Sequence, residues 1–237
     1  MIGKKIKIAL CLSGEPRNSM FCFPYISESF LVNYPQFEID TYIHTFKNYR
    51  AINLYNPVKL EIEYKDENKI YKSYTSKYGI NFVDLHNTPF RNTFLMHYGI
   101  DKCFELTSEV KYDYYIRCRP DIMFHSRLDL NYIISSLEDE NKDIWIPHSY
   151  DNSYWKHIIN DQLAVGNFKA IKAYSNTVYN LKELVDQVKS YYPEELLLTQ
   201  LKNNNIKIKY GYTHYSLLRK IMLITHPEVN TNAPSDY

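Results

Sequence analysis

Two arginines and an aspartate alternate along one segment of the chain, and their types and spacing suit the binding of an anion. Single residues separate Arg117, Arg119 and Asp121, and residues 112–118 are rich in aromatic and β-branched side chains. Such a segment favours a β-strand, in which side chains two residues apart share one face. The two guanidinium groups could bind phosphate oxygens, and the carboxylate could hold a divalent cation between them. The alternative is an internal salt bridge that closes the end of the strand.

Two further polar clusters follow segments with the composition of strands. Ser13, Gly14 and Arg17 come directly after the apolar segment 6–12, and the segment 37–45 ends in His44 and Thr45. Gly14 would let the backbone approach a ligand closely, and Arg17 could reach a phosphate. The first cluster lacks the spacing of a Walker loop and of the dinucleotide-binding glycine motif, so a plain turn is its alternative interpretation.

The surrounding pattern alternates strands with helices. Proline and acidic residues at 193–195 indicate a helix start, and Asp129 is a helix cap. Such alternation predicts an α/β fold with a central, mostly parallel sheet covered by helices. Ligand-binding residues of these sheets gather at the carboxyl ends of the strands, so we expect the polar clusters to meet. The predicted strands are 6–12, 37–45, 59–63, 112–119, 143–147, 161–166 and, last, 206–210. The predicted helices include 19–33, which we expect Pro24 to interrupt, 91–109 and 171–188.

Composition excludes several classes of function. The 237 residues carry a formal net charge of +1, so the basic field that accompanies nucleic-acid binding is absent. No segment is long and apolar enough to predict a membrane span, and the lysine-interrupted segment at the N-terminus indicates a strand rather than a signal peptide. The 4 cysteines show no metal-binding spacing. These features predict a cytoplasmic protein with reduced thiols.

Four motifs in order resemble a group of small GT-A-type glycosyltransferases encoded in bacterial polysaccharide loci and in large DNA viruses. The motifs are Leu-Ser-Gly-Glu-Pro-Arg at 12–17, Ile-Asp-Thr-Tyr-Ile-His-Thr at 39–45, the segment 112–121, and Asn-Asp-Gln at 160–162. The resemblance implies a single, Rossmann-related GT-A-like domain over 1–237. It would have a nucleotide-binding half over about 1–125, an acceptor half over about 126–226 and a loose tail at 227–237.

The resemblance also implies an activity: transfer of a hexosyl or pentosyl group from a nucleoside-diphosphate sugar to a hydroxyl of a glycan acceptor. The usual Asp-x-Asp motif, which holds Mn²⁺ or Mg²⁺, is Arg119-Pro120-Asp121 in this chain. The guanidinium of Arg119 could replace part of the charge of the cation. The sequence is therefore compatible with a transferase that needs the cation and with one that does not. The implied metal ligands are Asp121 and His214. The implied nucleotide-sugar-binding residues are Ser13, Gly14, Arg17, Arg117, Arg119 and Asp121.

An inverting transferase also needs a general base, usually a carboxylate. Asp161 is the candidate by its place in the family pattern, Glu194 is a second candidate, and a structural cap is the alternative for Asp161. His148, Tyr150 and Trp155 belong to a polar, aromatic loop that could bind the acceptor.

Two other functions remain open at this point. A nucleotidyltransferase would carry a basic, glycine-rich first loop and a second metal carboxylate, and the sequence shows neither. A non-catalytic nucleotide-sugar- or carbohydrate-binding protein on the same fold would bind a nucleotide sugar without transferring or hydrolysing it.

Overall fold

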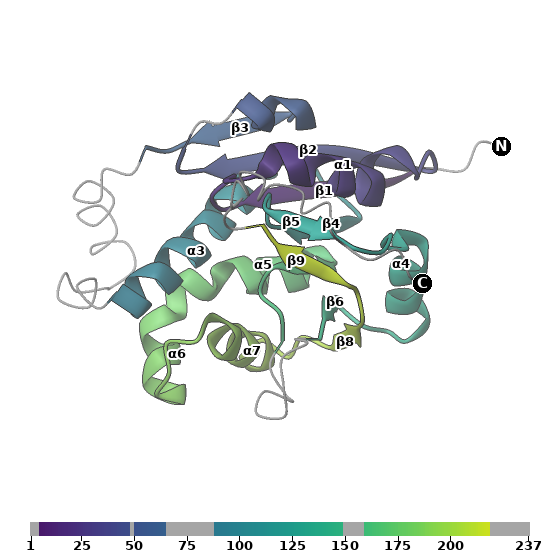
Figure 1. The fold of residues 1–237 in the computed structure, drawn as a ribbon. Helices are drawn as coiled ribbons and strands as arrows, with labels where there is room; N and C mark the ends of the chain where they lie inside the picture. Colours follow the sequence, from purple (N-terminus) through teal and green to yellow (C-terminus); the bar gives the residue numbers. More distant parts are fainter. Residues whose placement is uncertain (1–4, 48–49, 65–87, 149–158, 219–237) are drawn as a thin grey trace, which may run out of the picture.

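The computed structural model describes residues 5–47, 50–64, 88–148 and 159–218 (Figure 1). These residues contain a 7-stranded sheet in the order β3-β2-β1-β4-β7-β6-β8. Strand β7 runs antiparallel to its neighbours β4 and β6, and the other neighbouring strands are parallel. The strands are β1 (Ile6–Ser13), β2 (Phe37–Thr45), β3 (Lys59–Ile62), β4 (Tyr114–Cys118), β6 (Ile144–Pro147), β7 (Leu163–Gly166) and β8 (Ile208–Gly211). The predicted mostly parallel α/β sheet is therefore confirmed.

Strand β1 lies in the middle of the sheet because both of its faces are apolar. Ile8 and Leu10 pack in a core on one face, whereas Ala9 and Cys11 pack in a core on the other. A strand that is buried on both faces needs a nearly continuous apolar sequence, which residues 8–12 provide. Strands β2 and β4 pair with β1 on its two sides.

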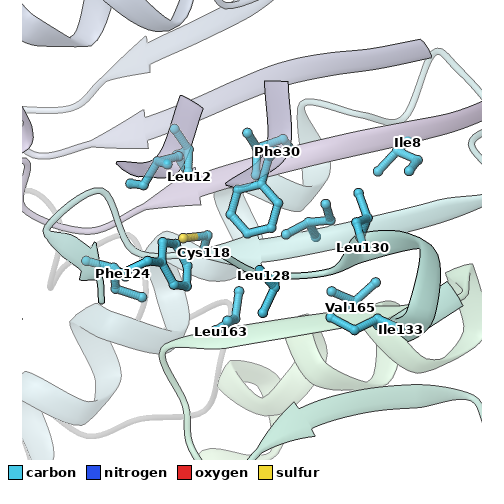
Figure 2. Packing of buried hydrophobic residues seen from close by; sticks show 14 of the residues in the cluster. Ile8, Leu12, Phe30, Cys118, Phe124, Leu128, Leu130, Ile133, Leu163 and Val165 are labelled. Carbon is cyan, nitrogen blue, oxygen red and sulfur yellow. The ribbon is translucent and has the colours of Figure 1, made fainter. Parts of the chain in front are cut away.

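Helical segments cover both faces of the sheet, as Figure 1 shows. The first core joins α1, the π-helical segment η1, α4 and a ribbon of β5 and β9 to the sheet. Figure 2 shows part of this core, with Phe30 of η1, Phe124 of β5 and Leu130 of α4 beside side chains of the sheet. The opposite face packs against α3, α5 and α7. The bounds are α1 (Ser19–Ile26), η1 (Ser27–Val32), η2 (Arg50–Tyr55), α3 (Thr88–Glu105), α4 (Leu130–Asp139), α5 (Phe168–Ser175), η4 (Asn176–Asn180), α6 (Leu181–Val188), α7 (Pro193–Asn203), β5 (Ile122–Phe124) and β9 (Tyr215–Leu217).

Several local predictions are confirmed. Asp129 is the cap of α4, and its side chain accepts a hydrogen bond from the backbone N–H of Tyr132 at 3.1 Å. Pro193 is the first residue of α7 and two glutamates follow it. The four cysteines are buried as free thiols. Among the described residues, no helix combines the length and the apolar character needed to cross a membrane.

The prediction of one continuous helix over 171–188 is wrong. Its middle is a short 3₁₀ helix, η4, which separates α5 from α6. Thr177 Oγ1 donates to the carbonyl oxygen of Tyr174 at 2.8 Å, and Ser175 Oγ donates to that of Lys172 at 3.1 Å. Short polar side chains that bond to the preceding turn in this way compete with regular helical bonding.

Two other elements differ from expectation. The helix predicted over 19–33 keeps Pro24 inside α1 and continues as the wider turn η1, so the proline does not interrupt it. The expected last strand begins at Ile208, and a further strand, β9, follows it and pairs with β5. With three residues each, β5 and β9 are too short to show a period of their own in the sequence.

Candidate active site

Three strand ends meet at one edge of the sheet. Leu12 of β1 lies opposite Cys118 of β4, and Cys118 lies opposite Leu163 of β7. Because β7 is antiparallel, its first residues rather than its last reach this edge. The loops that leave β1 and β4 therefore lie beside the residues that precede β7.

A cavity of about 560 Å³ opens at this edge. The loops after β1 and β4, the start of α7 and one side of α3 contribute to its lining. The cluster His44 and Thr45 is buried and does not line it. Six predicted residues line the cavity: Ser13, Gly14, Arg17, Arg117, Arg119 and Asp161. Three others are not among its lining residues: Asp121, His148 and His214.

Arg119 and Asp121 form a bidentate pair. Arg119 Nε and Nη2 each donate to one carboxylate oxygen of Asp121, both at 2.8 Å. Asp121 is 0% exposed and the Arg119 side chain is 16% exposed. Burial by itself would lower the pKa of Arg119, but the hydrogen bonds and charge of Asp121 outweigh it, and with the charge of Asp161 they raise that pKa. The guanidinium is therefore charged and fixed in direction.

Arg117 lies deeper in the same wall and is 2% exposed. Its Nη1 donates to the carbonyl oxygen of Ser13 at 3.2 Å. Its Nε and the hydroxyl of Ser13 have no hydrogen-bond partner among the described residues. Buried polar groups are almost always hydrogen-bonded in native proteins, so these donors beside the cavity indicate a site for a ligand.

The loop after β1 adopts a conformation that favours glycine. Gly14 has φ of 129°, which residues with a side chain rarely adopt. Arg17 Nε donates to Glu15 Oε2 at 3.0 Å, and the Arg17 side chain is 39% exposed. The loop thus holds a partly exposed guanidinium at the mouth of the cavity.

Asp161 is 5% exposed, and hydrogen bonds to its own carbonyl and to the next one anchor the backbone. Its carbonyl oxygen accepts from the Tyr174 hydroxyl at 2.7 Å, and the next carbonyl, that of Gln162, accepts from the backbone N–H of Arg119 at 3.1 Å. The residue thus borders the cavity at a fixed position, and its charge helps to raise the pKa of Arg119.

The predicted metal ligands do not come together. His125 donates its backbone N–H to the carbonyl of His214, whereas Leu218 donates to that of Asp121. These two hydrogen bonds lie at opposite ends of the β5–β9 ribbon, so His214 is beside His125 and not beside Asp121. Four residues of strand, or about 13 Å, separate positions 121 and 125. Both oxygens of Asp121 already accept from Arg119. No group of three potential metal ligands occurs in the part of the chain that the structure describes. These residues do not fit a divalent cation.

The predicted acceptor residues are only partly described. The ring of His148 stacks between those of Tyr210 and Tyr212, with centroid distances of 4.9 and 5.1 Å. It lies at the end of β6, outside the lining of the cavity. Tyr150 and Trp155 lie outside the described residues.

The cavity also contains Glu194, the second candidate for the base, and residues to which the sequence analysis assigned no role. Glu194 reaches it because α7 begins at the rim, and Thr93 Oγ1 of α3 donates to the carbonyl of Tyr191 at 2.8 Å, which joins α3 to the loop before α7. The alternative explanation for Glu194 is that an acidic residue in the first turn is stabilised by the helix dipole. The polar and tyrosine residues of the lining without a predicted role are Glu15, Asn92, Thr93, Gln162, Tyr191 and Tyr192.

A buried histidine close to Arg117 should make the stability of the folded protein depend on pH. His97 of α3 is 0% exposed, and burial together with the positive charge of Arg117 lowers its pKa from 6.5 to about 3. Between these values the unfolded chain binds one more proton, so stability falls as pH falls, by about 1.4 kcal/mol per pH unit. His97→Leu should reduce the slope of the unfolding free energy by that amount between pH 6 and 4, as measured by urea unfolding. An unchanged slope would show that His97 is protonated in the folded protein.

The mostly parallel sheet with helices on both faces is the architecture of GT-A-type glycosyltransferases. The structure of core-mannan synthase A (CmsA/Ktr4) from Aspergillus fumigatus in its Mn/GDP form matches with a TM-score of 0.50 at 9% identity, over 90% of this chain and 75% of that chain. The mannosyltransferase Ktr4p from S. cerevisiae gives TM-scores of 0.48, at 11% identity in complex with GDP and 9% in its other structure. Both cover 91% of this chain, and 71% and 70% of theirs. No family model and no curated protein matches the sequence.

Proposed function

We propose that this protein is a glycosyltransferase that moves a sugar from a nucleoside-diphosphate sugar to a hydroxyl of a glycan acceptor. The observation that carries the proposal is the gathering of three arginines, Arg17, Arg117 and Arg119, in one cavity at the strand ends of a GT-A-like sheet. Guanidinium groups bind phosphate oxygens with paired hydrogen bonds. The similarity in fold to core-mannan synthase A, which was solved in its Mn/GDP form, supports the same class of donor.

In this proposal the arginines stabilise the diphosphate as it leaves. Negative charge grows on the diphosphate when its bond to the sugar breaks, and fixed donors stabilise this charge without reorganising. Arg119 is held by Asp121, and Arg117 by the carbonyl of Ser13. Arg17 would bind the outer phosphate from the mouth of the cavity, and Gly14 would allow close approach of the backbone.

The second half of the reaction needs a base for the acceptor hydroxyl. Asp161 is the proposed base because its carboxylate group lines the same cavity as the arginines while its backbone is fixed. A base on the side of the sugar away from the diphosphate gives an inverting mechanism. His148, Tyr150 and Trp155 remain the proposed acceptor contacts.

Removing one phosphate ligand tests the assignment of the donor site. Arg17→Ala should weaken binding of GDP or UDP by about 1.5 kcal/mol, or roughly tenfold, the lower end for hydrogen bonds to charged groups because Arg17 is partly exposed. Guanosine and uridine should bind the variant and the parent protein alike. Isothermal titration calorimetry measures both, and exposed Arg127→Ala, outside the cavity, is the matched control.

The outcomes separate the proposal from its alternatives. Equal losses for nucleoside and nucleotide would place the diphosphate elsewhere. Mass spectrometry can detect the products of transfer and of slow hydrolysis. If a nucleotide sugar binds but neither product forms, the protein is a non-catalytic binding protein. Release of pyrophosphate from a nucleoside triphosphate would instead identify a nucleotidyltransferase.

A further inference from the structure

Asp121 occupies the position where the resemblance expects a metal-binding carboxylate, but its surroundings are those of a positioning residue. It is 0% exposed, and each of its oxygens accepts from a different nitrogen of Arg119. A cation at Asp121 would have to displace this guanidinium and reach a carboxylate that solvent does not contact. Hard divalent cations also require several oxygen ligands, and the described residues offer no group of three candidate side chains.

Asp121 fixes the orientation of the Arg119 guanidinium group. A guanidinium has five N–H bonds, and Asp121 receives one from Nε and one from Nη2, so the others can donate to a ligand. The side chain lines the cavity, with Asp121 behind it. The pair therefore presents a fixed, charged donor to the cavity.

Arg117 supplies a second positive charge, and the group that accepts its hydrogen bond is uncharged. The Ser13 carbonyl oxygen accepts from Arg117 Nη1 at 3.2 Å. No ion pair joins Arg117 to a carboxylate among the residues described. A buried charge is costly unless an opposite charge accompanies it. Together with the orphaned Nε and the orphaned hydroxyl of Ser13, this charge is matched to an anion that enters from the cavity.

We infer that the site binds the diphosphate of its nucleotide without a divalent cation, with Arg117 and Arg119 in the place of the metal and Asp121 as the residue that positions Arg119. The inference depends on the proposed nucleotide-sugar function, and it adds that the donor site is independent of metal. It replaces the predicted metal ligands Asp121 and His214 by two arginines on one strand end.

Calorimetry in two buffers tests the inference on the unmodified protein. GDP, UDP and inorganic pyrophosphate are titrated in a buffer with EDTA and again in a buffer with Mn²⁺. For each ligand that binds, the dissociation constants in the two buffers should agree within about twofold. Electron paramagnetic resonance of Mn²⁺ added without nucleotide should show only free ion. Binding that is at least tenfold weaker in EDTA and is restored by Mn²⁺ would overturn the inference while leaving the proposed function intact. No binding of any of the three in either buffer would overturn both.

Two variants test the positioning role of Asp121. Asp121→Asn removes the charge that orients Arg119, so it should weaken nucleotide binding by about tenfold or more and by the same factor in both buffers. A metal ligand would instead lose affinity only in Mn²⁺. Asp139→Asn, an exposed carboxylate on α4, is the matched control.

If Asp121→Asn does not fold, Arg119→Lys gives an independent answer. Lysine keeps the charge but not the two-pronged geometry, so it should also weaken binding equally in EDTA and Mn²⁺. Full affinity in Arg119→Lys would show that the direction of the guanidinium has no role, which would overturn the inference.

Discussion

Asp161→Asn is expected to lower kcat by about 10²–10⁴-fold while the affinity for the nucleoside diphosphate stays nearly unchanged. Asparagine keeps the size and most hydrogen bonds of aspartate but cannot accept the proton of the acceptor hydroxyl. The backbone of the site should not move, because the Asp161 carbonyl accepts from Tyr174 and the Gln162 carbonyl from the Arg119 N–H. Initial rates with a nucleotide sugar and a glycan acceptor, together with calorimetry of the diphosphate, measure the two effects separately.

The matched control for this prediction is Glu194, another acidic residue that lines the cavity. Glu194→Gln changes an acid at the start of α7 and should reduce the rate much less than Asp161→Asn does. Nuclear magnetic resonance of the first product should show an anomeric configuration opposite to that of the donor. Retained configuration, or near-normal turnover in Asp161→Asn, would leave Asp161 as a structural residue. A large loss confined to Glu194→Gln would move the role of base to α7.

Arg119→Ala is expected to reduce the free energy of unfolding by about 3–5 kcal/mol, the range for removing one partner of a buried ion pair. The loss comes from Asp121, which is 0% exposed and would lose both of its hydrogen bonds from Arg119 together with the opposite charge. Urea unfolding at pH 7 measures the change. Surface Lys7→Ala, which breaks an exposed pair with Glu38, is the control and should leave the free energy of unfolding nearly unchanged, because water screens exposed ion pairs.

A double variant shows whether the loss is due to the unpaired charge. Arg119→Met with Asp121→Leu replaces both partners by apolar side chains and should recover much of the stability lost in Arg119→Ala. Nucleotide binding should not recover, because the donor is gone. If Arg119→Ala costs less than about 1 kcal/mol, water must reach Asp121 and the pair does not have the rigidity that its geometry indicates.

The sequence by itself determined the elements whose signals are local. The apolar run of β1 predicts a central strand because both faces must be covered. Asp129 predicts a helix start because its side chain can accept a hydrogen bond from a backbone N–H of the first turn. Pro193 predicts one because the first helical residue needs no N–H donor. The rule that ligands gather at carboxyl ends of parallel strands was enough to bring Ser13, Arg17 and Arg119 into one predicted site. The single domain with two halves remains a prediction.

Only the tertiary structure decided how the charged residues are used. The order of the strands places the reversed β7 beside β4, so that Asp161 at its beginning meets Arg119 at the end of β4. The ribbon of β5 and β9 holds His214 away from Asp121, and α7 brings Glu194 to the rim of the cavity. A period of two placed Arg119 and Asp121 on one face, but it could not show whether the carboxylate faces a ligand or its own neighbour. These relations depend on pairing and burial between segments far apart in the chain, and neither local propensity nor periodicity contains that information.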